Sequence, residues 1–361
     1  MLGLTSIVVL LSVTLASSQP VDINAQKGQY WGEKGLANPS RRLREIADFA
    51  LLYFNATTEF RAVLLFTIAT PASKDNVLPR LLENLASFKS HDQVDTNGND
   101  ATSLAEHTIV GTTNMDTQHA CDKLAEKHRQ KCYELDHGFN QGAQGLLSAA
   151  NSKVHAYSVG LSRIKALIDL ISMGYDVLYF DLHHYFFQNP LKYMYSHTRA
   201  PLVVSGTPSS GCRQLQSGPD GSLPDDHHRL DIAFMRSGPA AFRCMYNWLY
   251  WSTHTAHDVN DRPLDHHTFR NVMQECVLSL GKQVMSVEYL SPAAFPSECA
   301  TKCGCRADNP VQPAPDGSCS KDDMSSWVGY LFSCTPNPAD LDALLLKYGT
   351  MYRNAGIVST R

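Results

Sequence analysis

The residues best suited to chemistry lie in the stretch YFDLHHYFFQNP, which spans positions 179–190. Asp181 ends an apolar run that is typical of a buried strand, and the adjacent histidines His183 and His184 follow after one leucine. Carboxylates and imidazoles are both ligands for divalent cations. Either these three side chains meet a ligand where the strand stops, or they form a hydrated loop that is rich in histidine.

The segments around this stretch alternate between helical and extended patterns. Asp116 is the expected N-cap of the third helix, and Gly174 marks the end of the fourth. This alternation predicts an α/β fold with a mostly parallel sheet flanked by helices. The expected helices cover residues 41–54, 77–88, 115–128, 161–174, 239–251 and 266–280, and the expected strands cover residues 61–70, 107–114, 175–182, 201–208 and 231–237.

The position of Asp181 favours a ligand site over a hydrated loop. In open α/β sheets, ligands bind beyond the carboxyl ends of the strands. Asp181 lies at such an end. The sequence contains no GKS or GKT phosphate loop and no G-x-S-x-G nucleophile elbow, which excludes two common α/β chemistries.

The first 18 residues are an expected signal peptide, because an apolar run from Leu4 to Leu15 precedes Ala16 and Ser18. A short signal anchor is the alternative, and no other segment of the sequence is expected to cross a membrane. The predicted location is therefore the secretory pathway, in the Golgi lumen or outside the cell. A net charge of −4 without any basic block argues against a nucleic-acid partner.

Ten cysteines fit an oxidising compartment. Cys121 and Cys132 flank a helical pattern and are one candidate pair. The C-terminal segment is interpreted as a disulfide-stapled extension, and a zinc site on its CATKCGC run is the rival interpretation. Asn55, in the sequence NAT, is an expected glycosylation acceptor. The cysteines of the C-terminal segment are Cys299, Cys303, Cys305, Cys319 and Cys334.

The stretch LIDLISMGYDVLYFDLHHYFFQNPL, residues 167–191, resembles the nucleotide-diphospho-sugar transferase family. These are GT-A-type glycosyltransferases, which include plant and algal cell-wall arabinosyl- and xylosyltransferases. Family members show a helix ending in LLELGYDVLFSD, then a D-x-D motif and a hydrophobic tail that ends in NP and a leucine. Weaker likenesses follow in the same order at residues 107–135, 264–273 and 287–297. The resemblance implies a GT-A-like, Rossmann-type fold, to which the cysteine pattern adds a disulfide-rich C-terminal extension.

The resemblance also implies a chemistry for Asp181. In the family, the two carboxylates of D-x-D hold Mn²⁺ or Mg²⁺ against the diphosphate of a sugar nucleotide, whose developing charge must be neutralised. Here His183 replaces the second carboxylate. His183 either binds the metal in its place, or donates a hydrogen bond or positive charge to the diphosphate without a metal, or marks an inactive site. The expected cofactor, on Asp181 and His183, is Mn²⁺, with Mg²⁺ or Zn²⁺ as alternatives.

Three residues outside the central motif receive roles from the resemblance. Arg163 stands where the family commonly has a lysine near the nucleotide, so it is expected to bind the donor with Asp181 and His183; a solvated helix arginine is the alternative. Asp265 and His266 are the expected catalytic residues, facing the transferred sugar and the acceptor, and Asp265 also suits a helix N-cap. One hypothesis is a shared metal site built from Asp181, His183, Asp265 and His266 or His267. The alternative is that these histidines lie at loop edges and are merely hydrated.

The chain is accordingly divided into four parts. They are a signal peptide at 1–18, an N-terminal helical extension at 19–59, a transferase-like domain at 60–298 and a cysteine-rich segment at 299–361. The expected function is the transfer of a sugar from a nucleotide diphosphate donor, a UDP-sugar, to a glycan or glycoprotein acceptor. The alternatives are a catalytically inactive member that binds nucleotides or sugars, and a metal-dependent lumenal hydrolase.

Overall fold

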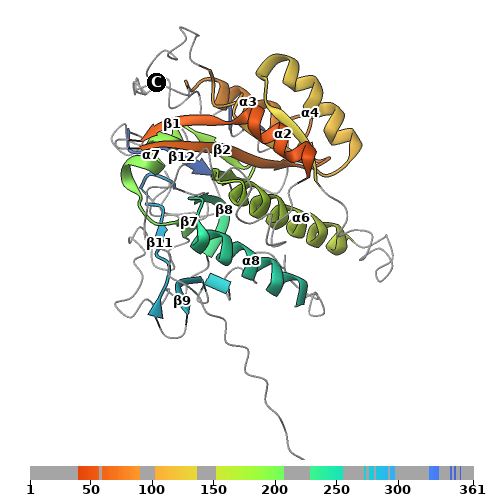
Figure 1. Cartoon of the computed structure of the whole chain (residues 1–361). Helices are drawn as coiled ribbons and strands as arrows, with labels where there is room; N and C mark the ends of the chain where they lie inside the picture. The colour runs from red at the N-terminus through yellow and green to blue at the C-terminus, as the bar shows by residue number, and fades with distance from the viewer. Residues whose placement is uncertain are drawn as a thin grey trace, which may run out of the picture.

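One eight-stranded sheet organises the protein (Figure 1). The computed structural model describes residues 40–56, 59–89, 102–135, 152–206, 228–254, 272–273, 276–279, 282–291, 293–296, 325–332, 342–343, 345–346 and 350. The strands of the sheet are β1 (Leu52–Ala56), β2 (Glu59–Ala69), β3 (Thr108–Thr112), β4 (Lys131–Glu134), β5 (Asp176–Phe180), β7 (Leu202–Gly206), β8 (His228–Met235) and β11 (Val287–Tyr289).

The sheet has the strand order β11-β7-β8-β5-β2-β3-β4 and is mostly parallel. Strand β8 runs antiparallel to both of its neighbours, and β1 forms an antiparallel hairpin with the start of β2. From β2 the chain moves outward through β3 and β4, and it then returns to place β5 on the other side of β2. The strand order therefore reverses between β2 and β5, which is where open α/β sheets bind ligands.

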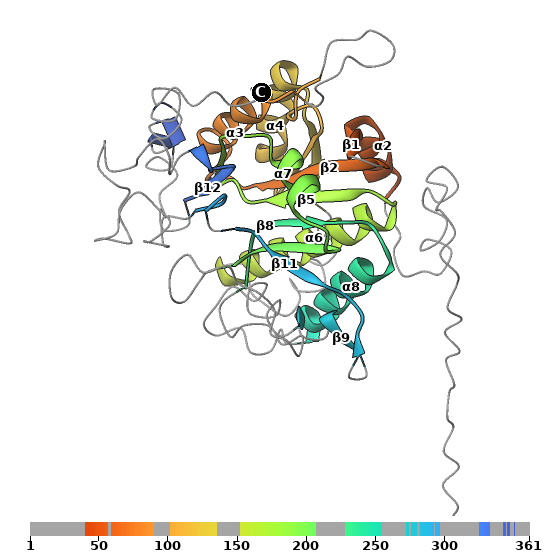
Figure 2. The same ribbon diagram turned by 90° about the vertical axis from the view of Figure 1, so that its left-hand side faces the viewer.

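Helices cover both faces of the sheet. Helices α2 and α6 and the N-terminal half of α8 share one hydrophobic core with one face, while α3, α7 and part of α4 share a second core with the other. Helices α6 and α8 pack side by side (Figure 2). The helices are α2 (Arg41–Ala50), α3 (Val77–Ala86), α4 (Met115–His128), α6 (Ser152–Ser172), α7 (Pro190–His197) and α8 (Pro239–His254).

The central strands are buried on both faces, because apolar side chains fill both alternating positions. In β5, Val177 and Tyr179 point into the α6 and α8 core, and Leu178 and Phe180 point into the α3 and α7 core. The expected α/β architecture with a mostly parallel sheet is thus confirmed. None of the helices in the described part of the chain is long and apolar enough to cross a membrane.

Several boundaries differ from the expectation. The expected helix 41–54 ends at Ala50, and the β-forming residues that follow pair with β2 as β1. Asn114, and not Asp116, caps α4, because its side-chain oxygen accepts from the N–H of Thr117 at 2.9 Å. Asp116 lies in the first turn, where a negative charge interacts favourably with the helix dipole. In the last expected helix, 266–280, Leu278 and Ser279 form a short strand, β9, which pairs with β10 (Lys282–Gln283).

A small second sheet follows β5 directly. Strand β6 (His184–Phe186) pairs with β12 (Gly329–Leu331) from the C-terminal part of the chain. Trp327 packs on Phe187, with ring centroids 5.4 Å apart. Residues 325–332 therefore cover the segment that follows Asp181. The cysteines at 299–334 lie outside the described residues.

Two disulfides lie in the described part of the chain. The expected pair Cys121–Cys132 is confirmed and ties α4 to β4. A second bridge, Cys244–Cys276, ties α8 to the segment before β9 and was not anticipated from the sequence. Each bridge thus links a helix that packs beside the sheet to another part of the chain, which is the edge strand β4 in one case and the segment before β9 in the other.

Candidate functional site

Asp181 directly follows β5 at the carboxyl edge of the sheet, next to the point where the strand order reverses. Val177 and Tyr179 point to the α6 side, so the alternation of side chains brings Asp181 to that side as well. The N–H of Asp181 donates to the carbonyl of Asp231 on β8 at 2.7 Å, which fixes the strand end. The side chain of Asp181 is 26% exposed, so its carboxylate reaches the surface.

A buried tyrosine and a buried arginine hold the Asp181 carboxylate from behind. The hydroxyl of Tyr179 donates to Oδ1 of Asp181, and Nη1 of Arg163 donates to the same hydroxyl at 2.8 Å. Nη1 of Arg163 also lies 3.7 Å from Oδ1 of Asp181. The contacts that Tyr179 and Arg163 make with the carboxylate thus both involve the same oxygen, Oδ1.

Burial and charge set the protonation states of this triad. Burial raises the pKa of Tyr179 well above its usual value, so the phenol stays neutral and donates its proton. Burial opposes the charge on Arg163, but Tyr179 and Asp181 outweigh it and raise the pKa of Arg163. A permanent positive charge therefore lies behind Asp181, and only 8% of the Arg163 side chain is exposed.

The two histidines after Asp181 differ in their surroundings. His184 is buried, stacks on Phe186 with ring centroids 6.1 Å apart, and has Nδ1 3.2 Å from the carbonyl of Asp181. Burial lowers the pKa of His184 to about 4. The interpretation of His184 as a ligand-facing residue is therefore wrong, because its ring belongs to the core.

His183 is the exposed member of the pair. It lies in the turn between β5 and β6, and its carbonyl accepts from the N–H of Phe332 at 2.9 Å. The C-terminal part of the chain thus holds the backbone of this turn, while the imidazole remains accessible. Of the two histidines, His183 alone is placed to meet a ligand.

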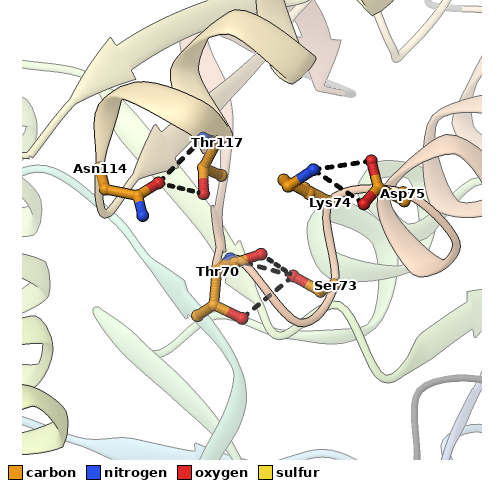
Figure 3. A network of polar contacts seen from close by, with 6 residues as sticks. All are labelled: Thr70, Ser73, Lys74, Asp75, Asn114 and Thr117. Carbon is orange, nitrogen blue, oxygen red and sulfur yellow. Dashed lines mark hydrogen bonds and ion pairs between the residues drawn. The ribbon is translucent and has the colours of Figure 1, made fainter.

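Polar side chains also follow the two neighbouring strands at the same edge (Figure 3). After β2, the hydroxyl of Ser73 accepts from the N–H of Thr70 at 2.9 Å, and Lys74 pairs with Asp75 at 2.8 Å. After β3, Asn114 caps α4 as described above. These residues were not predicted as part of the site, although their positions directly after apolar strands could have indicated it.

Part of the expected site cannot be placed. Asp265, His266 and His267 lie outside the described residues. The hypothesis of a metal site shared between the two loops therefore stays a prediction. Asn55 lies in β1, where its backbone is paired with Phe60 of β2, and its glycosylation also stays a prediction.

The comparison with protein families decides the relationship of the chain. The model of the nucleotide-diphospho-sugar transferase family matches residues 103–314, which include β5, Asp181 and the turn that follows. The chain belongs to the nucleotide-diphospho-sugar transferase family. Together with the topology of the sheet, membership in this family confirms the GT-A-like fold class expected from the sequence. A comparison with curated proteins gave no match.

A comparison with solved structures found glycosyltransferases and cytidylyltransferases. Mouse xyloside xylosyltransferase 1 is 12% identical, and the alignment covers 65% of this chain and 87% of that one, with a TM-score of 0.38. The galactosyltransferase LgtC, solved with donor and acceptor sugar analogs, is 11% identical over 82% of this chain and 96% of that one, with a TM-score of 0.44. With identities this low and TM-scores below 0.5, these likenesses carry no argument about the fold or the substrates of this chain.

Members of the nucleotide-diphospho-sugar transferase family act on phosphate-bearing ligands, so the fit of a divalent cation to this site is relevant. Within the described ranges, no three His, Cys, Asp or Glu side chains gather closely enough to form a metal centre built by the protein alone. A cation that arrives with a diphosphate needs only one or two protein ligands, because the phosphates supply the others. The partly exposed carboxylate of Asp181 and the exposed imidazole of His183 are ligand types that suit this smaller requirement.

Proposed function

We propose that this protein is a glycosyltransferase that moves a sugar from a nucleotide diphosphate, a UDP-sugar, to a glycan or glycoprotein acceptor. The observation that carries the proposal is the position of Asp181 in a chain of this family. Its carboxylate is half-buried at the carboxyl end of β5, where the strand order reverses. A carboxylate at that point suits a ligand that brings its own cation.

Three residues of the site would contribute to donor binding, each in a different way. Asp181 would hold the cation that accompanies the diphosphate, and His183, two residues later and exposed, would hold the same cation or a phosphate oxygen. A bound Mn²⁺ or Mg²⁺ supplies positive charge to the leaving diphosphate. Arg163 adds a fixed positive charge behind Asp181, which lowers the cost of gathering negative groups there.

Asp265 and His266 complete the proposal. The family resemblance of residues 264–273 assigns these two residues to the side of the site that faces the transferred sugar and the acceptor. A carboxylate can accept the proton of the acceptor hydroxyl, and an imidazole can accept or donate one. The proposed setting is the secretory pathway, in the Golgi lumen or outside the cell, with a signal peptide at residues 1–18 and a glycan on Asn55.

A catalytically inactive member that binds nucleotides or sugars is the second candidate. Two observations favour it. The motif has lost its second carboxylate to His183, and the remaining carboxylate already contacts the buried Arg163 at 3.7 Å. Both features reduce the negative charge that the site offers to a cation.

Calorimetric titration of UDP and GDP into the full chain, with and without Mn²⁺, separates the candidates. A glycosyltransferase is expected to bind one nucleotide in a metal-dependent manner, to bind it more weakly but still measurably in Asp181→Asn, and to hydrolyse the matching sugar nucleotide slowly. Metal-dependent binding without any turnover across a panel of donors and acceptors would support the inactive member. No binding of either nucleotide would overturn the glycosyltransferase and would leave only an inactive member that binds sugars.

A further inference from the structure

The Tyr179 hydroxyl lies at the junction between the buried positive charge and the exposed carboxylate. It accepts from Nη1 of Arg163 at 2.8 Å and donates to Oδ1 of Asp181. A phenol has one proton to donate and oxygen lone pairs to accept with, so both bonds form at once.

The position of this hydroxyl follows from strand geometry. Residues two apart in a strand point to the same face, and Tyr179 stands two residues before Asp181. The Tyr179 ring is 1% exposed, and it packs between Phe66 on β2 and the guanidinium of Arg163. A ring fixed in this way cannot follow a moving carboxylate, so the carboxylate must adopt the orientation that the hydroxyl dictates.

Arg163 is too deeply buried to contact the sugar nucleotide directly. Its side chain is 8% exposed, and one of its amino groups is already bound to Tyr179. Arg163 therefore acts on a ligand at the surface only indirectly, through the Tyr179 hydroxyl and the Asp181 carboxylate. Charge-assisted hydrogen bonds of this type are short and directional, which makes them suited to fixing an orientation.

We propose that Tyr179 is a positioning residue for donor binding, because its hydroxyl links Arg163 to Asp181 and presents the second oxygen of Asp181 to the cation and diphosphate of the donor. This inference rests on the proposed function. The tyrosine contacts neither sugar nor nucleotide and acts only through Asp181. The alternative is a hydrogen bond that merely stabilises the core.

The chain offers a matched control for that alternative. The hydroxyl of Tyr195, which is also buried, donates to Oδ2 of Asp176 at 2.9 Å. Asp176 is the first residue of β5, at the opposite end of the strand from Asp181. Tyr195→Phe thus removes the same bond type from the same strand, away from the site.

The test compares the binding of UDP and Mn²⁺ in Tyr179→Phe, Tyr195→Phe and the unchanged full chain, with thermal unfolding as a second measurement. We expect both variants to lose thermal stability, but only Tyr179→Phe to weaken UDP–Mn²⁺ binding, by about tenfold, the value of a hydrogen bond to a charged group. Equal nucleotide affinity in the two variants and the unchanged chain would overturn the role of Tyr179 and leave the proposed function standing.

A double-mutant cycle provides the sharper readout. If Tyr179 acts through Asp181, then Tyr179→Phe has no further effect on nucleotide affinity in an Asp181→Asn background. Additive losses would overturn the proposal, because they would mean a path that does not involve Asp181. Should Tyr179→Phe fail to fold, Arg163→Lys replaces it in the same cycle, since it keeps the charge but withdraws the donor from Tyr179. Absence of UDP and GDP binding in the unchanged chain would overturn the proposed function itself.

Discussion

The hydroxyl of Tyr195 on α7 donates to the carboxylate of Asp176, the first residue of β5, at 2.9 Å. The other oxygen of Asp176 accepts from the N–H of Ser237 at 2.8 Å. Asp176 and Asp181 therefore stand at the two ends of one strand, and a buried tyrosine binds each of them. The carboxylate at the amino end is fully buried, whereas the carboxylate at the carboxyl end reaches the surface. One pair is buried at the amino end of the strand, and the other holds the carboxylate to which we assign the donor.

Tyr195→Phe is expected to lower the free energy of unfolding by about 2 kcal/mol, because it leaves a buried carboxylate without one of its donors. Urea denaturation followed by circular dichroism measures the change. The slope of the free energy against urea should stay the same, since the surface exposed on unfolding does not change. A loss below about 0.5 kcal/mol would mean that another group takes over the bond.

Asn84 on α3 is the main polar link between that helix and β6. Its Nδ2 donates to the carbonyl of Phe186 at 2.8 Å, and its Oδ1 accepts from the N–H of the same residue at 2.8 Å. Asn84→Asp keeps the shape but turns the donor into a second acceptor, which faces the carbonyl. We expect a loss of about 3 kcal/mol in the free energy of unfolding, greater than for Asn84→Ala. The reverse order in urea denaturation would contradict this account.

The Cys121–Cys132 bridge closes a loop of 11 residues between α4 and β4. Replacing both cysteines by alanine is expected to destabilise the protein by about 3 kcal/mol, mainly because the unfolded chain gains freedom. Thermal unfolding under non-reducing conditions gives the measurement. A matched Cys244→Ala and Cys276→Ala variant should lose somewhat more, since its loop of 32 residues is longer.

Much of the fold was accessible from the sequence because its signals are local. The apolar runs that form β2, β5 and β7 are buried on both faces of the sheet. Short apolar runs of this kind, bounded by turn residues, predict buried strands. Strand β4 was not assigned, because KCYE has only four residues and gains its structure from pairing with β3. Strand β1 was assigned to a helix for the same reason: its pairing with β2 overrides a helical pattern.

The candidate site was only partly accessible. Asp181 was predicted because a carboxylate after a buried strand is a recognisable pattern. The exposure of His183 and the burial of His184 depend on β12, which lies over 140 residues away in the sequence. The bond between Tyr179 and Asp181 follows the alternation of side chains, but the arrival of Arg163 at the same hydroxyl depends on how α6 packs on the sheet. The alternation of side chains along β5 therefore predicts the contact between Tyr179 and Asp181. It does not predict the contact between Arg163 and Tyr179.

His184 makes stability depend on pH. Burial lowers its pKa from 6.5 to about 4 in the folded state. Between these values the unfolded chain binds a proton that the folded chain does not, so stability falls as the pH drops from 6.5 towards 4. The full cost is on the order of 3 kcal/mol. Urea denaturation at a series of pH values, with EDTA present to remove metals, measures this loss.

His184→Phe is the comparison for that series, because phenylalanine retains a ring against Phe186 but does not titrate. The loss of stability between pH 7 and pH 5 should be smaller in the variant than in the unchanged chain. Other groups that titrate in this range contribute equally to both proteins. Parallel curves for the two proteins would show that His184 is not the group responsible.

His183→Ala tests the part of the site that replaces the second carboxylate. If His183 binds the cation, the variant should lose affinity for Mn²⁺ in the presence of UDP by about tenfold or more, measured by calorimetry. His197→Ala is the matched control, since His197 is also exposed but lies at the end of α7 and stacks on Tyr193. If His183 instead contacts a phosphate oxygen, His183→Ala should weaken UDP binding equally with and without Mn²⁺. Unchanged affinity under both conditions would mean that Asp181 carries the donor site without His183.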